Sequence, residues 1–243
     1  MQLHCLQDHY DITQLWQRYT EAATTYYRQC GEDGPDGGIR RFDVRLRLVM
    51  GMSITLDDQV AQVRSKNTMD TNLLYLEMTH TWFAYEAFLD FLKGCGYRGF
   101  KTNIEGKLQK HPRLLHLHNL RDACRTVLRK ELLNRANRQV DLIEFVRYLA
   151  DQIHLVKGRP SKHKQALEDF AKQLGQDLPR APEHKHLLGF AYSLRNLFVH
   201  AGEAAKSGVD SYRTKIYSLR LLIDYLVVLQ LQMGAVLLEE ACD

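Results

Sequence analysis

The chain has 243 residues, of which 45% are hydrophobic, and its formal net charge at pH 7 is +4, so it is long and apolar enough to bury a full core. Its five cysteines contain no close pair, which argues against both a disulfide framework and a zinc knuckle. No N-terminal segment resembles a signal peptide, so we expect a cytoplasmic protein.

The predicted elements are helical throughout, because no stretch shows the alternation that is typical of a strand. Glycine-rich turns such as residues 31–38 separate the helices, and Gly51 weakens the second one. The sequence therefore predicts an all-α fold. In chain order, helices are predicted over 11–27, 41–64, 73–92, 119–134, 141–156, 162–174, 183–202 and 211–240, with a short piece near Ile104, a break at Pro112 and a turn at 158–161.

The last predicted helix contains an apolar run, Leu221 to Leu238, that is long enough to be considered as a membrane span. Asp224, Gln230 and Gln232 interrupt this run, and polar side chains are costly inside a bilayer. We therefore expect a buried core helix and no contact with a membrane.

A strongly basic segment lies in the middle of the chain. Residues 98–164 contain 16 Lys and Arg against 6 Asp and Glu, a balance of +10. Arg121, Arg125 and Arg129 lie at positions i, i+4 and i+8, on one flank of a predicted helix. Such a surface attracts polyanions, so we expect these three arginines to bind nucleic acid. The alternative is a solvated charged face.

The segment from Leu187 to Gly202 is the place where helical periodicity and reactive side chains coincide. Apolar residues recur at i, i+3, i+4 and i+7 and form a stripe for the core. On a helical wheel Asn196 lies opposite this stripe, between Arg195 and His200, so we expect the three side chains to share one outward surface. Gly202 is expected at the C′ position, which places His200 in the last turn, where the helix dipole favours its protonated form.

Arg195 and Asn196, followed by His200, resemble the Arg-x4-6-His motif of the HEPN superfamily, whose members are all-α and often metal-independent RNA-cleaving enzymes. Four Arg–His pairs in the chain have such a spacing, about as many as chance gives. Only this pair has an asparagine directly after the arginine, a long apolar helix before it and a glycine soon after it. The resemblance implies a helical bundle of HEPN type.

A second stretch agrees with this resemblance. Trp82, Glu86 and Phe88 are similar to the early helix of larger HEPN proteins, in which an acidic residue often lies near the motif arginine. The resemblance therefore implies that Glu86 orients Arg195 through a charge-assisted pair. A solvated surface carboxylate is the equally weighted alternative for Glu86. Trp82 and Phe88 are expected in the core.

The resemblance also implies a division of the chain. Residues 67–243 are expected to form the HEPN-like domain, with a basic helical insertion at about 98–180. Residues 1–66 are then an N-terminal helical extension.

RNA cleavage by this motif would divide three tasks among three side chains. His200 would exchange protons with the ribose 2′-hydroxyl or the leaving oxygen, Arg195 would bind the phosphate, and Asn196 would position a phosphate oxygen or His200. The nucleophile is already in the substrate, so no metal and no cofactor are expected. One histidine cannot easily serve as both base and acid, which implies a homodimer through the motif helix. The resemblance also implies an antitoxin or a defence complex as a partner.

Two rival interpretations remain open. The first is a catalytically inactive HEPN-like module that binds RNA or a nucleotide, or serves as a scaffold. The second is a structural helical domain in which Arg195 pairs with Glu86 and His200 only caps its helix.

Five other histidines are expected to have structural roles. His184 and His186, in the first turn of the motif helix, are expected to be neutral surface residues because a positive charge there opposes the dipole. His111, His116 and His118 lack acidic or cysteine neighbours at a metal-ligand spacing, so no metal site is expected there.

Overall fold

The computed structural model describes residues 2–31, 38–55, 65–94, 97, 104–157, 162–176, 180–201 and 207–242. Every regular element in these ranges is helical, and no residue in them lies in a strand. The all-α class expected from the sequence is therefore confirmed.

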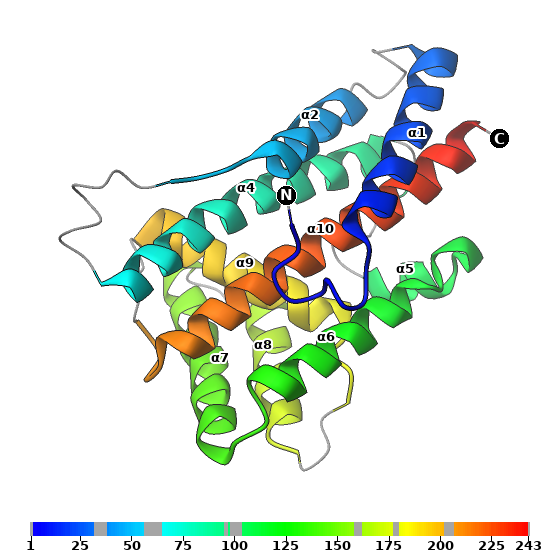
Figure 1. Ribbon diagram of the computed structural model, residues 1–243. Coiled ribbons are helices and arrows are strands. Elements are labelled where there is room, and N and C mark those ends of the chain that lie inside the picture. Colours follow the sequence, from blue (N-terminus) through cyan, green and yellow to red (C-terminus); the bar gives the residue numbers. More distant parts are fainter. Residues whose placement is uncertain are drawn as a thin grey trace. The chain divides into compact units, whose positions relative to one another are not determined.

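The helices follow the predicted order closely, and most predicted ends agree within a few residues (Figure 1). They are α1 (Ile12–Cys30), α2 (Gly38–Gly51), α4 (Lys66–Gly94), α5 (Ile104–Gln109), the 3-10 helix η1 (Pro112–Leu114), α6 (Leu117–Glu131), α7 (Ala136–Lys157), α8 (Lys162–Leu174), α9 (His184–Ala201) and α10 (Tyr212–Cys242).

Helix α4 begins at Lys66, before its predicted start at residue 73, and the second helix does not continue to its predicted end at residue 64. It ends at Gly51, and residues 52–55 are not helical. Glycine has more backbone freedom than other residues in the unfolded chain, so its ordering in a helix costs more entropy. The helix therefore ends at Gly51 although the periodic pattern continues beyond it. The remainder of that prediction, 56–64, lies outside the described residues, as do the turn at 158–161 and the C′ residue Gly202.

The chain divides into two compact units. The boundary between them falls inside the long helices α4 and α10, so each unit takes one part of both helices. Unit 1 consists of Met1–Met52, His80–Leu120 and Asp224–Asp243, and unit 2 consists of Ser53–Thr79 and Arg121–Ile223.

In unit 1, a buried carboxylate holds the segment that precedes α1. The two oxygens of Asp224 accept hydrogen bonds from the backbone N–H groups of His4 (3.0 Å), Cys5 (2.5 Å) and Leu6 (2.9 Å). A buried carboxylate is costly unless its oxygens are hydrogen-bonded, and these donors meet that requirement. Residues 1–52 thus share a unit with the second half of α10, and the predicted division at residue 66 stays a prediction.

The core of unit 1 is aromatic. The ring of Phe42 lies 4.7 Å from that of Phe88 and 5.7 Å from that of Tyr19. Gly234 of α10 faces this cluster, where a Cβ atom would come within 3.1 Å of the Tyr19 ring. Trp82 and Phe88 are buried, so their predicted place in the core is confirmed. This part of α10 packs closely because residue 234 has no side chain.

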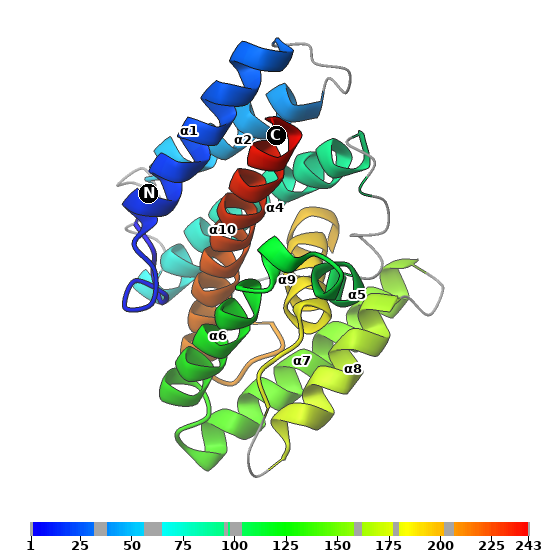
Figure 2. The same ribbon diagram turned by 90° about the vertical axis from the view of Figure 1, so that its right-hand side faces the viewer.

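In unit 2, α7, α8 and α9 pack against one another (Figures 1 and 2). Phe190 of α9 sits between two rings, 5.8 Å from Phe145 of α7 and 6.1 Å from Phe170 of α8. At Gly189 a Cβ atom would lie 3.3 Å from the Cβ of Ala166, so the glycine permits close approach of α9 to α8. These contacts fix the helix that carries the Arg-x4-His motif.

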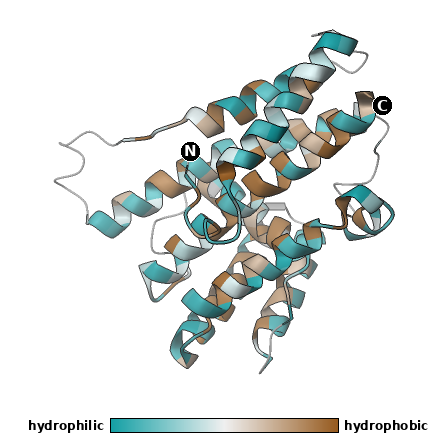
Figure 3. Cartoon of the chain, turned by 45° about the vertical axis from the view of Figure 1, so that its right-hand side comes forward, coloured by the Kyte–Doolittle hydropathy of each residue, from teal (hydrophilic) through white to brown (hydrophobic). Residues whose placement is uncertain are grey.

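Helix α10 is long and apolar enough to cross a membrane, with a mean hydropathy of 2.0 over its most apolar 18 residues. All of that window is buried, which fits the core helix expected from the sequence. In Figure 3 much of the helix that leads to the C-terminus is brown, the colour of hydrophobic residues. Asp224 and Gln230, which interrupt the run, are themselves buried.

Candidate functional site

The last turns of α9 bring Arg195, Asn196 and His200 together within unit 2. Nη1 of Arg195 donates a hydrogen bond to Oδ1 of Asn196 at 2.9 Å and lies 3.4 Å from Nε2 of His200. A guanidinium can only donate, so the ring nitrogen that faces it must accept. This contact therefore suits a neutral His200 whose proton is on Nδ1.

The three motif residues differ in their exposure to solvent. His200 is exposed and Arg195 is half-buried, but Asn196 is only 4% exposed. The expected outward position of Asn196 is therefore wrong. The helical wheel assumed a single buried face, whereas α9 is surrounded on most sides and also buries Ser193. The buried Asn196 is hydrogen-bonded to the half-buried guanidinium of Arg195 and helps to position it.

Two residues that were not singled out from the sequence support this end of α9. Tyr75 of α4 stacks on Phe198 with ring centroids 4.6 Å apart and planes at 2°. The fully buried Lys215 lies with its Nζ 5.8 Å from the Tyr75 ring, and this Nζ donates to the carbonyl oxygen of Ser207 at 2.6 Å. The stack fixes the rotation of the last turns of α9, and with it the direction of the motif side chains.

Glu86 belongs to unit 1, where it is half-buried on α4. Its Oε1 accepts a hydrogen bond from the indole Nε1 of Trp82 at 3.0 Å, one helical turn away. The Trp82–Glu86 spacing therefore serves a contact within α4. The pairing of Glu86 with Arg195 stays a prediction.

The three arginines of the predicted basic surface lie on α6 at the expected spacing, but they have different surroundings. Nε of Arg121 donates to the carbonyl oxygen of Pro182 at 2.9 Å and so ties α6 to the segment before α9. Arg125 forms an ion pair with Asp122 at 3.1 Å, and Arg129 is exposed. Arg121 thus has a structural role, and RNA binding by the three residues stays a prediction.

At the other end of α9, His184 and His186 are buried, so their expected surface position is wrong. The backbone N–H of Glu183 donates to Nδ1 of His186 at 3.2 Å, and the ring of His186 stacks on Phe170 at 5.4 Å. The imidazole takes the place of the Glu or Gln that usually closes a capping box. Burial lowers the pKa of His186 to about 4, so the residue is neutral, as expected.

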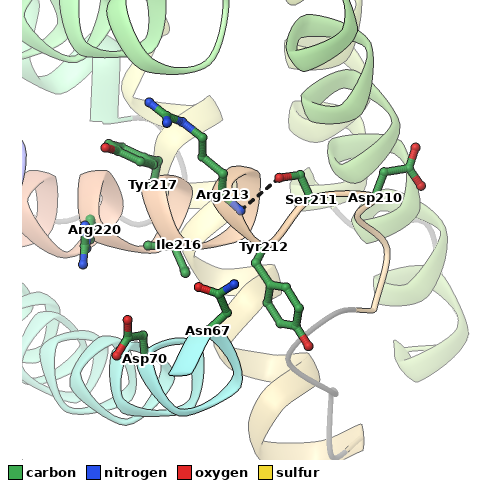
Figure 4. A pocket seen from close by; sticks show the side chains of 9 residues that line it. All are labelled: Asn67, Asp70, Asp210, Ser211, Tyr212, Arg213, Ile216, Tyr217 and Arg220. Atoms are coloured by element: carbon green, nitrogen blue, oxygen red, sulfur yellow. Dashed lines mark hydrogen bonds between the residues drawn. The ribbon is translucent and has the colours of Figure 1, made fainter. Parts of the chain in front are cut away.

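A pocket of about 490 Å³ lies in unit 2 between the first turns of α4 and α10 (Figure 4). Asn67 and Asp70 approach it from α4, and Tyr212, Arg213 and Arg220 from α10. None of these residues was singled out from the sequence. The available signal was the spacing of Arg213, Tyr217 and Arg220 at i, i+4 and i+7, which places them on one face of a helix.

In the part of the chain that the structure describes, no group of three or more His, Cys, Asp or Glu side chains is arranged to hold a metal ion.

The chain was compared with known proteins by sequence and by structure. No protein-family model matches it, and no curated protein and no solved structure matches it either. The resemblance to the HEPN superfamily therefore depends on the residues of α9 and α4 described above.

Proposed function

We propose that this protein is a metal-independent endoribonuclease of the HEPN type. The observation that carries the proposal is the convergence of Arg195 and His200, with Nη1 and Nε2 3.4 Å apart at the end of α9. A donor fork for phosphate and a titratable ring beside it are the two groups that strand cleavage by the ribose 2′-hydroxyl requires.

The chemistry assigns a separate task to each side chain. Neutral His200, exposed to solvent, accepts the proton of the 2′-hydroxyl as that oxygen attacks the adjacent phosphorus. Arg195 binds the phosphate oxygens and stabilises their added negative charge. Asn196 is buried and accepts a hydrogen bond from Arg195, so it positions the guanidinium and does not itself touch the substrate.

The leaving 5′ oxygen also needs a proton, and one His200 cannot easily give and take protons in the same step. We infer that two chains pair through the motif helix and each supplies one histidine. The exposed end of α9 supports this inference, because the apolar Val199 next to His200 is 41% exposed. Such a cytoplasmic ribonuclease would act in a toxin–antitoxin or antiviral system, with an antitoxin or a defence complex as its regulator.

The test is cleavage of an end-labelled RNA in excess chelator by the wild-type protein, by His200→Ala and by His9→Ala. His9 is an exposed histidine of unit 1 and serves as the matched control. We expect wild type and His9→Ala to cut equally and His200→Ala to lose at least about 100-fold in rate. Cleavage that requires a metal, or that survives in His200→Ala, contradicts the proposal. RNA that is bound but never cut indicates the inactive binding module instead.

A further inference from the structure

We propose that the pocket between α4 and α10 binds one nucleotide of the RNA, with a phosphate on Arg220 and the ribose 2′-hydroxyl on Asp70. The choice of RNA as the ligand rests on the proposed function. The pocket lies wholly in unit 2, as the motif residues do, but it shares no residue with them.

The pocket is open to solvent and is of suitable size for a small ligand. Its volume of about 490 Å³ falls within the range of small-molecule sites, roughly 300 to 1,000 Å³. A hydrogen bond of 3.1 Å between the hydroxyls of Tyr212 and Thr68 joins the starts of α10 and α4 beside it. This bond fixes the Tyr212 ring as a wall on which a nucleobase can stack.

Arg220 provides the phosphate site. Its Cζ lies 5.9 Å from the centroid of the Tyr217 ring, and that of Arg213 lies 4.9 Å from the same ring. Arg213 is neutralised by Glu131 at 2.9 Å. Arg220 has no ion pair with any described residue, and its Nε is buried without a hydrogen-bond partner among them. A partly desolvated guanidinium whose Nε lacks a hydrogen-bond acceptor is unfavourable, and an anionic ligand that supplies the acceptor removes that penalty.

Asp70 and Asn67 provide the opposite wall. Both side chains project from α4 toward α10 in Figure 4, and neither has a side-chain hydrogen bond or ion pair within the described ranges. A carboxylate repels phosphate and accepts from hydroxyl groups, so Asp70 binds a hydroxyl of the ligand and leaves the phosphate to Arg220. The 2′-hydroxyl is the donor that distinguishes RNA from DNA. Asp210, at the edge of the pocket, points away from Arg220 in Figure 4 and leaves this polarity unchanged.

The first test uses His200→Ala as the background, so that RNA is not cut while its binding is measured by fluorescence anisotropy of a labelled short single strand. Arg220→Met is compared with Arg41→Met, which removes the same charge from unit 1, where Arg41 makes only a loose 3.8 Å ion pair with Asp90. We expect the dissociation constant to rise about tenfold for Arg220→Met and less than about twofold for Arg41→Met. Equal effects of the two substitutions overturn the inference.

A second test does not depend on Arg220, and so covers the case in which Arg220→Met fails to fold. Asp70→Ala, on a half-buried surface of α4, should reduce the preference for RNA over DNA of the same sequence about tenfold, because the substitution removes the acceptor of the 2′-hydroxyl. An unchanged preference overturns the assignment of Asp70.

If Arg220-dependent RNA binding is found but no cleavage, the pocket stands and the proposed ribonuclease fails. If RNA is cut and neither substitution alters its binding, the pocket fails and the ribonuclease stands.

Discussion

Replacing His186 with glutamine is expected to make the protein less sensitive to acid. In the folded state the ring of His186 is buried on Phe170, and its Nδ1 accepts from the N–H of Glu183, which requires a neutral imidazole. Burial lowers its pKa from 6.5 to about 4. The unfolded chain therefore binds a proton that the folded chain rejects, and stability falls as the pH falls through this window.

The magnitude follows from the two pKa values. Between about pH 7.5 and about pH 5, the unfolded state gains about 2 kcal/mol relative to the folded state through His186 alone. At pH 5 this figure depends mainly on the pKa of His186 in the unfolded chain. Glutamine can accept the same N–H bond and does not titrate, so the substitution removes the loss without removing the cap.

The assay is urea unfolding, followed by circular dichroism, of wild type and His186→Gln at both pH values. The difference between the two proteins in free energy of unfolding should shift by about 2 kcal/mol in favour of the glutamine variant at the lower pH. All other titrating groups are common to both proteins and cancel in this comparison. Parallel pH profiles would refute the buried, neutral imidazole, whatever the absolute stability of the variant.

Three further predictions concern the anchor of the N-terminal segment, the basic helix and the shared site. Asp224→Ala leaves three backbone N–H groups without their acceptor, so the free energy of unfolding should fall by about 3 kcal/mol and the amides of His4 to Leu6 should exchange faster with deuterium; a loss below about 1 kcal/mol would contradict the anchor. The double substitution Arg125→Glu and Arg129→Glu should weaken RNA binding and reduce the slope of log affinity against log salt concentration by roughly 0.7 per lost contact. Cleavage at saturating RNA should be retained. Unchanged affinity would mean that this face of α6 does not contact RNA. Wild-type and His200→Ala chains refolded together should give activity that follows the square of the wild-type fraction, whereas a straight line would show that each chain works alone.

The helices were predictable because their apolar residues repeat over long stretches, where periodicity is a strong signal. For α8 the predicted and observed ends are the same, Lys162 and Leu174. At Gly51 the pattern continued although the helix did not, because a periodic stripe carries no information about the local cost of a glycine.

The site was only partly predictable, because side-chain burial depends on tertiary neighbours. The wheel placed Asn196 outward, and the packing around α9 buried it. Asp224 was read as an interruption of an apolar run, yet its partners lie more than two hundred residues away in sequence. The pocket joins Asp70 and Arg220, whose proximity no local pattern could indicate. In each case the missing information was a contact between distant segments.

The most direct measurement of the central claim is the fate of one defined RNA whose cleaved nucleotide carries either the 2′-hydroxyl or a single 2′-deoxy substitution. If His200 activates the 2′-hydroxyl, the ribose form should be cut to a 2′,3′-cyclic phosphate, identified by mass spectrometry, and the deoxy form should remain intact at that position. Cleavage of the deoxy form, or products that end in a 3′-hydroxyl, would contradict the mechanism assigned to Arg195 and His200.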